Sequence, residues 1–353
     1  MQPYKLVLST GKSFSGLSPD WLQDDIYGEV VFTTGMVGYT ETLTDPSYKN
    51  QIVVFTYPLI GNYGVENEQF WESGKIHAKG VVINNLEEHY SRNDRVSSFA
   101  DWCKNQGVAL ITDIDTRAVT KTIRSSGALA GAICSQSSNP VAFANINQEN
   151  LVAQVSRQQT EIINKENAKH SVIVVDCGMK QNILRLLKQL PVNLKVVPYD
   201  YDYSNEDFSG IFLSNGPGDP LKCQDTIEIL KRSFGKKKPV FGICLGAQLM
   251  ALATGAKTKK LHFGHRSQNQ PCMHVESKKC YLTSQNHGYV ICEDTLPDDW
   301  RISWRNLNDA TVEGIEHKID PFFAVQFHPE ATPGPNDTTW MFQHFYELIQ
   351  KHN

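Results

Sequence analysis

The sequence predicts an α/β protein in which a mixed α/β domain is followed by a domain with a doubly wound, mostly parallel sheet. A chain of 353 residues is long enough for two domains that each bury a core. A polar stretch at residues 157–170 interrupts the apolar segments. After it, continuous apolar runs alternate with helical patterns, which is typical of parallel strands covered on both faces. We therefore expect domains at residues 1–150 and 171–353, joined by a linker at 151–170.

Within residues 1–150, apolar runs and turn residues predict the elements in order. Helical spacing predicts a helix over 95–106, and Asp115 with Thr116 predicts the beginning of another. A weak helical pattern runs from Pro140 to about Val155, and Asp45–Tyr48 is typical of a turn. The expected strands cover residues 5–10, 28–34, 51–57, 79–84 and 128–134.

Residues 171–353 show the alternation of strands and helices most clearly. Ligands of such sheets bind at the carboxyl ends of the strands, so residues that directly follow a strand are candidates for a site. The expected strands cover residues 171–177, 194–197, 210–213, 240–243, 279–284, 301–305, 312–317 and 322–327. The expected helices cover residues 181–190, 225–234 and 337–351.

The composition restricts the kind of protein. Charged residues make up 20% of the chain and hydrophobic residues 40%, as in ordinary soluble proteins. The net charge of -4 argues against binding nucleic acid by neutralising phosphates. No apolar run approaches the roughly 20 residues of a membrane span, and the first residues do not resemble a signal peptide. We expect a cytoplasmic protein that binds neither nucleic acid nor membranes.

Cysteines and histidines give no sign of a disulfide framework or a metal site. The eight cysteines form no Cys-x-x-Cys pair and have no regular spacing, so a reducing compartment would keep them as free thiols. No cluster of carboxylates or cysteines completes a metal site around the histidines at positions 262, 265, 274 and 287. We expect no metal.

Cys244 is the first candidate for chemistry. It follows a short apolar strand and precedes leucines at helical spacing, which predicts a strand, a sharp turn and a helix. Gly242 and Gly246 flank it, as glycines flank the serine in the Gly-x-Ser-x-Gly nucleophile elbow. The first N–H groups of the helix would then stabilise negative charge on the sulfur. A lone cysteine is often a buried apolar residue, so this turn alone leaves a structural role open.

His328 and Glu330 are the candidate base and acid. They follow an apolar strand, and residues two apart in an extended chain point to the same side, so Glu330 could orient the imidazole. A cysteine, a histidine and an acid make an activated thiol. His-Pro-Glu alone also fits a half-buried histidine beside a surface acid, but together with the Cys244 turn it favours catalysis.

A loop rich in glycine and proline, residues 214–220, follows another apolar strand. Its backbone N–H groups suit an anion, such as the oxygen of a tetrahedral intermediate. A dinucleotide loop would need glycine at Leu221, and a Walker loop ending at residues 11–13 would need glycine at Leu6. The sequence therefore predicts no ATP site in this chain.

These segments resemble a known family. Residues 242–248, 215–220 and 326–330 resemble the three signatures of class I, triad-type glutamine amidotransferase domains. Residues 34–48, 55–64 and 115–124 resemble the amino-terminal domain of the carbamoyl-phosphate synthase small subunit. The resemblance covers essentially the whole chain, and it implies a small-subunit domain followed by a glutaminase domain.

The resemblance implies an enzyme subunit that hydrolyses glutamine and donates ammonia. Cys244 would form a glutamyl thioester, His328 would pass a proton to the leaving ammonia, and Glu330 would orient His328. The N–H of Leu245 would help to bind the oxyanion. The implied glutamine-binding residues are Ser47, Gly216, Gly218, Leu245, Gln248, Asn286, Gly288 and Tyr289.

The family also implies a partner. Ammonia would pass through an internal tunnel to a large synthetase subunit, which would bind ATP, magnesium and bicarbonate, while this chain would bind no cofactor. The product would serve arginine or pyrimidine biosynthesis. The chain departs from the family pattern at residues 264–272, at Thr40 and at Cys177, none of which belongs to the triad.

The sequence leaves two other classes of function open. One is an amidotransferase subunit of another synthase or a free-standing γ-glutamyl hydrolase, against which residues 1–150 argue. The other is a non-catalytic regulatory scaffold. The loss of the cysteine, histidine or glutamate would mark such a scaffold, and this sequence retains all of them.

Overall fold

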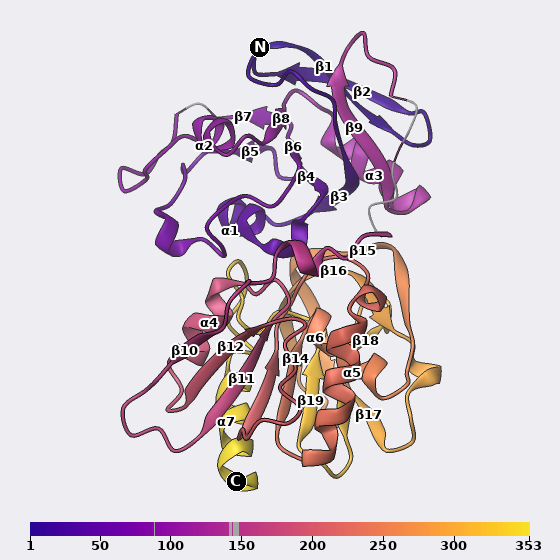
Figure 1. Cartoon of the computed structure of the whole chain (residues 1–353). Coiled ribbons are helices and arrows are strands. Elements are labelled where there is room, and N and C mark those ends of the chain that lie inside the picture. The colour runs from indigo at the N-terminus through magenta and orange to yellow at the C-terminus, as the bar shows by residue number, and fades with distance from the viewer. Residues whose placement is uncertain (88, 141–142, 144–147) are drawn as a thin grey trace. The chain divides into compact units, whose positions relative to one another are not determined.

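Two units make up the chain in the computed structural model, which describes residues 1–87, 89–140, 143 and 148–353 (Figure 1). Unit 1 contains Met1–Ile146 and, from the second half of the chain, His262–Arg266. Unit 2 contains Asn147–Leu261 and Ser267–Asn353. The domain boundaries at 150 and 171 stay predictions.

Unit 1 is built on a seven-stranded mixed sheet. Strands β3, β4, β6 and β8 run parallel to one another, while the pairs β2–β1, β1–β9 and β9–β3 are antiparallel. In sheet order the strands are β2 Ser13–Ser18, β1 Gln2–Leu8, β9 Leu129–Ser135, β3 Ile26–Thr33, β4 Gln51–Phe55, β6 Gly80–Val82 and β8 Ala109–Ile111. A separate small sheet pairs β5 Leu59–Ile60 with β7 Asn85–Leu86.

Helices cover both faces of this sheet, because alternate residues of its strands are apolar in both directions. Val31 of β3 packs in the cluster of helices α1 and α2, whereas Val30 and Phe32 pack in that of α3. This confirms the mixed α/β class. The helices are α1 Tyr39–Thr44, α2 Phe99–Asn105 and α3 Thr116–Ser126.

The helix boundaries agree with the sequence where a capping residue marks them. Asp115 accepts the N–H of Ala118 at 2.9 Å and begins α3 as predicted. Helix α2 begins later than expected, because Ser98 accepts the N–H of Asp101 at 3.1 Å. Helix α1 was not predicted. Of the helical pattern expected from Pro140, residues 141–142 and 144–147 lie outside the described residues, and a short 3-10 turn covers Val152–Gln154.

Unit 2 is built on a ten-stranded sheet whose five central strands, β12, β11, β13, β14 and β19, run parallel. The other strands extend the sheet on both sides, with antiparallel pairs at β10–β12 and from β19 through β18 and β17 to β15. In sheet order the strands are β10 Glu161–Ile163, β12 Asn193–Pro198, β11 Ser171–Asp176, β13 Gly210–Leu213, β14 Val240–Ile243, β19 Phe322–Val325, β18 Val312–His317, β17 Trp300–Asn306, β15 Thr258–His274 and β16 Cys280–Ile291.

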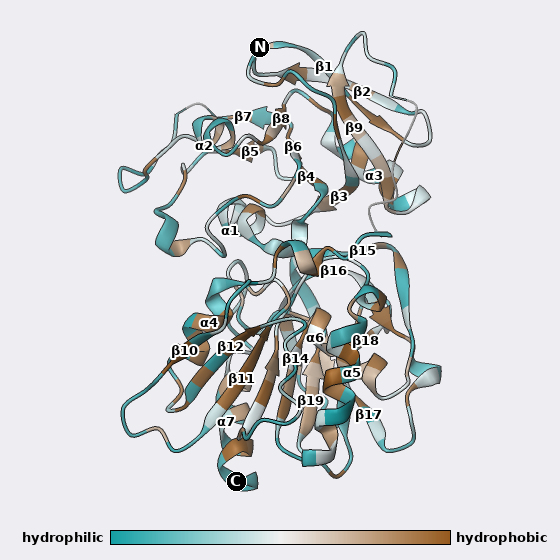
Figure 2. Ribbon diagram, in the orientation of Figure 1, coloured by the Kyte–Doolittle hydropathy of each residue, from teal (hydrophilic) through white to brown (hydrophobic). Residues whose placement is uncertain are grey.

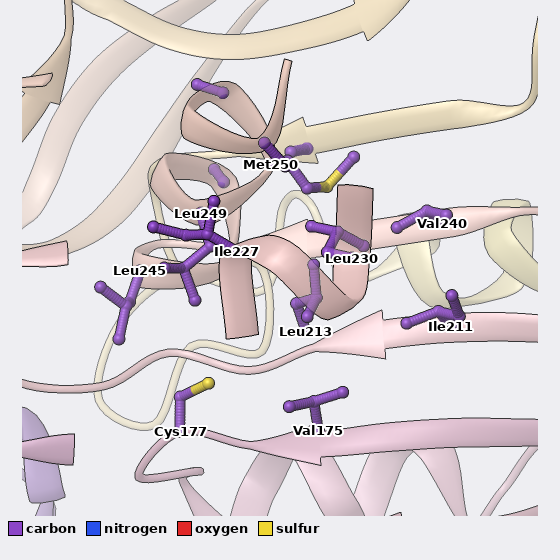
Figure 3. Packing of buried hydrophobic residues seen from close by; sticks show 14 of the residues in the cluster. Val175, Cys177, Ile211, Leu213, Ile227, Leu230, Val240, Leu245, Leu249 and Met250 are labelled. Atoms are coloured by element: carbon purple, nitrogen blue, oxygen red, sulfur yellow. The ribbon is translucent and has the colours of Figure 1, made fainter. Parts of the chain in front are cut away.

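Two hydrophobic clusters lie on opposite faces of this sheet, which confirms the doubly wound arrangement. Helices α5, Gln224–Ser233, and α6, Leu245–Ala253, pack against Val175 and Leu213 on one face (Figure 3). Helices α4, Gln181–Leu187, and α7, Trp340–His352, pack on the other. Figure 2 shows the hydrophobic colour along β11, which is buried on both faces.

The segment expected to be a linker contributes to unit 2. Strand β10 pairs with β12 at the edge of the sheet, and the Lys165 ammonium donates to the carbonyl oxygens of three residues that follow α4. The polar composition hid this strand, because a three-residue edge strand buries little: Ile162 is 65% exposed. Among the described residues, none of the helices combines the length and the apolarity that a membrane crossing requires.

Candidate active site

The carboxyl ends of three neighbouring parallel strands bring the predicted catalytic segments together. Strand β13 leads into the 214–218 loop, β14 leads into Cys244, and β19 leads towards His328. Because β13, β14 and β19 are adjacent and parallel, all three segments leave the same edge of the sheet.

Cys244 occupies a sharp turn between β14 and α6, as predicted. Its φ of 53° and ψ of -104° are unusual for a residue with a side chain. Both flanking glycines are required by close packing. A Cβ at Gly242 would lie 2.7 Å from the carbonyl carbon of Gly246, and a Cβ at Gly246 would lie 2.4 Å from the carbonyl oxygen of Leu213. The helix can therefore approach the strands only because these positions have no side chain.

The sulfur of Cys244 is buried and has polar neighbours. Gln326 Nε2 donates to Sγ at 3.6 Å, and the carbonyl oxygen of Asn286 lies 3.6 Å from Sγ. Gln326 is held in turn, because its Oε1 accepts from Gln248 Nε2 at 3.0 Å. The same Gln248 amide donates to the carbonyl oxygen of Tyr289 at 3.0 Å. Gln326 was not among the predicted site residues, although it lies in the quoted 326–330 signature.

His328 and Glu330 form the expected pair, but not in the expected way. Glu330 Oε1 lies 2.6 Å from His328 Nδ1, and both residues are buried. We expected the two side chains to meet because they lie on the same side of an extended strand, and this expectation is wrong. Strand β19 ends at Val325, and the pair spans a turn in which the N–H of Ala331 donates to the carbonyl oxygen of His328 at 3.2 Å.

This contact fixes the chemistry of the imidazole. An ionised carboxylate can only accept, so Nδ1 donates to Glu330 and Nε2 is the nitrogen that can exchange a proton with substrate. In the described part of the chain, His328 Nε2 has no hydrogen-bond partner. Cys244 nevertheless acts electrostatically on this ring.

Lys180 completes the array, although it was not among the predicted site residues. Its ammonium lies 3.0 Å from Glu330 Oε1 and also donates to the carbonyl oxygen of Ala331. Both side chains are buried, with 3% of Lys180 and none of Glu330 exposed. A lysine in the turn between strand β11 and helix α4, at the edge that carries the site, was the signal that could have found it.

The two pKa shifts follow from this arrangement. Burial alone lowers the pKa of His328, but the Glu330 carboxylate and then Cys244 raise it to about 10. Burial alone raises the pKa of Glu330, but the Lys180 ammonium and then His328 lower it to about 2. At neutral pH the pair is therefore ionised. When the thiol proton resides on His328, the four groups carry two positive and two negative charges, which limits the cost of burying them.

The 214–218 loop packs closely against its neighbours. A Cβ at Gly216 would lie 2.1 Å from the carbonyl oxygen of Cys177, and Gly218 has a φ of 84°. The carbonyl oxygen of Ser214 accepts the N–H of Gly246 at 3.1 Å, which ties the loop to α6. Leu245 is the first residue of α6, so its N–H has no partner one turn back in the helix.

The other predicted glutamine-binding residues fall into both units. Asn286, Gly288 and Tyr289 lie on β16, and two of them contact the Cys244–Gln248 region as described above. Ser47 belongs to unit 1, where it is buried in a 3-10 turn and its N–H donates to Asp45 Oδ1 at 2.9 Å.

Three of the four histidines considered for a metal contact other groups of the chain. His262 Nε2 lies 3.2 Å from the carbonyl oxygen of Ser125, and His274 Nδ1 lies 2.9 Å from Ser277 Oγ. His287 Nε2 lies 2.6 Å from Gln285 Oε1. That the chain binds no metal stays a prediction.

Two family models match the chain. Residues 6–133 match the carbamoyl-phosphate synthase small chain, CPSase domain, and residues 173–348 match the class-I glutamine amidotransferase. The chain is 44% identical to the "Carbamoyl phosphate synthase arginine-specific small chain" of Saccharomyces cerevisiae, over 98% of this chain and 88% of that protein. It is 43% identical to the protein of the same description from Aspergillus clavatus, over 97% of this chain and 77% of that one.

A third relative is much longer. The chain is 43% identical, over 98% of its length, to the "Multifunctional protein CAD" of Squalus acanthias, of which it covers 16%. All three matches therefore run through both units.

Proposed function

Because this chain belongs to the carbamoyl-phosphate synthase small-chain family, we propose that its candidate active site hydrolyses glutamine and supplies ammonia for the synthesis of carbamoyl phosphate. The observation that carries this function is a cysteine on a strained turn, beside a buried histidine that a carboxylate orients. The chain is a glutamine amidotransferase subunit rather than a non-catalytic scaffold.

In the first half of the proposed reaction, Cys244 Sγ attacks the side-chain carbonyl carbon of glutamine. The proton of the thiol resides on His328 Nε2, and Glu330 keeps Nδ1 in place as a donor. The N–H of Leu245 and the 214–218 loop stabilise the tetrahedral oxyanion. The imidazolium then protonates the leaving nitrogen, the carbon–nitrogen bond breaks, and ammonia and a glutamyl thioester remain.

In the second half, water hydrolyses the thioester. His328 Nε2 takes a proton from the attacking water, a second tetrahedral intermediate forms, and the carbon–sulfur bond breaks to release glutamate. The proton on His328 and the charge on Cys244 restore the starting state. Lys180 keeps Glu330 ionised throughout, since the pKa of Glu330 is lowered to about 2.

We propose the glutamine-binding residues on the family pattern and on their surroundings in unit 2. The contacts of Cys244 with Asn286, and of Gln248 with Tyr289, support a substrate pocket beside the sulfur. The full proposed set is Ser47, Gly216, Gly218, Leu245, Gln248, Asn286, Gly288 and Tyr289.

We also propose the division of labour with a partner. The ammonia passes through an internal channel to a large synthetase subunit, which binds ATP, magnesium and bicarbonate. This chain holds no cofactor and works in the cytoplasm. The names of the fungal relatives support a role in arginine biosynthesis, and pyrimidine biosynthesis, which the family resemblance also implies, is the second candidate.

Replacing Cys244 tests this function. In the complex of this chain with its large subunit, Cys244→Ala abolishes the synthesis of carbamoyl phosphate from glutamine, because no thioester can form. Synthesis from added ammonia continues, which shows that the complex is intact. Continued use of glutamine by the variant would contradict the assignment.

A further inference from the structure

An ion pair joins the segment expected to be a linker to the end of a central strand. Arg157 Nε lies 3.1 Å from Asp176 Oδ2, and Arg157 Nη1 lies 2.9 Å from Glu161 Oε2 of β10. The side chains of Arg157 and Asp176 are only 18% and 11% exposed. Asp176 is the last residue of β11, so this pair fixes the point where the strand ends.

The other oxygen of Asp176 shapes the turn that follows. Oδ1 accepts the backbone N–H groups of Gly178 at 2.9 Å and Met179 at 2.8 Å. An aspartate carboxylate that accepts the backbone N–H groups of the residues two and three positions later closes a tight turn. These hydrogen bonds take the place of the backbone bonds that a continuing strand would make. Gly178 has a φ of 111°, which a residue with a side chain rarely adopts. The carboxylate of Asp176 therefore dictates the path of residues 176–180.

One side of this turn rests on the 214–218 loop. The N–H of Cys177 donates to Ser214 Oγ at 2.9 Å, and the N–H of Lys180 donates to Asn215 Oδ1 at 3.0 Å. The carbonyl oxygen of Cys177 lies so close to Gly216 that no Cβ fits there. A shift of the turn would move the loop proposed to bind glutamine and the oxyanion.

The other end of the turn carries the Lys180 ammonium to Glu330. Lys180 Nζ lies 3.0 Å from Glu330 Oε1 in a buried place, where a displaced ammonium would leave the carboxylate with His328 as its only charged partner among the contacts described above. Asn182, two residues later, donates to the backbone carbonyl of Glu330 at 2.6 Å. The position of the acid thus depends on where the turn ends.

We propose that Asp176, held by Arg157, is a positioning residue that sets both halves of the site. Through the turn it places Lys180 on Glu330, and through Cys177 it supports the 214–218 loop. The inference rests on the proposed function of Glu330 and His328. Arg157, which holds Asp176, belongs to the stretch that the sequence predicts to be a polar linker.

The test measures glutamine hydrolysis by the full chain in complex with its large subunit. The variants are Asp176→Ala, Asp176→Asn and Arg157→Gln. Asp202 and Arg232 supply matched controls, since Asp202 also accepts a backbone N–H, from Ser204 at 3.0 Å, and pairs with Arg232 at 2.9 Å, but at the surface. The controls are Asp202→Ala and Arg232→Gln.

Asp176→Ala lowers kcat by about tenfold or more and raises KM, because small displacements of reacting groups are costly. Arg157→Gln and Asp176→Asn give smaller losses, since the turn keeps an acceptor for its N–H groups. A fourth variant, Arg157→Lys, keeps more activity than Arg157→Gln, because its ammonium can still pair with the Asp176 carboxylate. The acid limb of the pH profile of kcat moves to higher pH in Asp176→Ala, because Glu330 loses the Lys180 ammonium. The Asp202 and Arg232 variants match the wild type.

A double-mutant cycle separates positioning from a general loss of structure. In a Lys180→Met background, Asp176→Ala lowers kcat by a much smaller factor than in the wild type, because only the support of the 214–218 loop remains to be lost, whereas the rise in KM remains. A loss of kcat of the same size in both backgrounds would overturn the inference. If Asp176→Ala does not fold, Arg157→Gln and Asp176→Asn decide: an acid limb in the wild-type position contradicts the proposal.

The outcomes also distinguish this inference from the proposed function. If the wild type does not hydrolyse glutamine, or Cys244→Ala still does, the proposed function fails whatever the Asp176 variants do. If the wild type is active, Cys244→Ala is inactive and Asp176→Ala matches Asp202→Ala, only the positioning role fails.

Discussion

The proposed nucleophile and the proposed acid–base pair of this site are built in opposite ways. The turn at Cys244 is made by one continuous stretch, β14 through α6, with glycines on both sides of the sulfur. The acid–base pair draws on two distant stretches, because Lys180 reaches Glu330 across 150 residues of sequence. A local turn can be recognised in the sequence, whereas a charge array assembled by the fold cannot.

Removing Lys180 should have the largest effect, because it breaks the buried ion pair with Glu330. In Lys180→Met, the buried Glu330 keeps its charge without the ammonium, and breaking a buried pair in this way costs about 3–5 kcal/mol. We expect a corresponding loss in the free energy of unfolding measured in urea. Arg232→Met, which breaks an exposed pair, should change it little. Equal effects of the two variants would contradict the account.

The same variant changes the pH dependence. The pKa of Glu330 is lowered to about 2 in the folded chain, below its ordinary value of 4.5. Its contribution to stability is therefore fully present above pH 4.5 and is lost as the pH falls towards 2. Without Lys180 the pKa of Glu330 rises, so the loss begins at higher pH and the total is smaller. An unchanged acid limb would show that Lys180 does not act on Glu330.

A smaller effect is expected from adding a side chain at a glycine beside Cys244. In Gly246→Ala the new Cβ would lie 2.4 Å from the backbone oxygen of Leu213, which cannot move aside alone. Forced repacking of this kind costs about 1–3 kcal/mol and should displace Cys244. The control is Gly235→Ala, because a Cβ there would meet no atom of the described residues within 4 Å. Thermal unfolding and glutaminase assays compare the two, and full activity of Gly246→Ala would contradict the packing argument.

The contrast between local turns and contacts made across the fold also explains which elements and site residues could be predicted from the sequence. Strands β13, β14 and β18 were predicted to the residue, because both faces are buried or the pattern is bounded by turns. The pairing of His328 with Glu330 was predicted, but through a strand rather than the turn that forms. Neither Lys180 nor Gln326 was assigned to the site, since the partners that define their roles lie far away in sequence and only the position of Lys180 after β11 hinted at one.

The shortest segments were the hardest to predict. Strand β10 is polar and short, and its pairing with β12 depends on a partner that comes later in the chain. The six-residue helix α1 begins after Gly38, and no side chain caps it. Its beginning depends instead on the hydroxyl of Tyr63, which accepts the N–H of Gly38 at 2.7 Å. Such contacts come from the tertiary structure, and no local pattern announces them.

The central claim is that Cys244 carries the covalent intermediate. The most direct measurement is acid quenching of the complex during turnover of glutamine, followed by mass spectrometry of the peptides. We expect a glutamyl adduct on the peptide that contains Cys244, and none in Cys244→Ala. An adduct on another cysteine, or turnover with no adduct while hydrolysis of the thioester limits the rate, would contradict it.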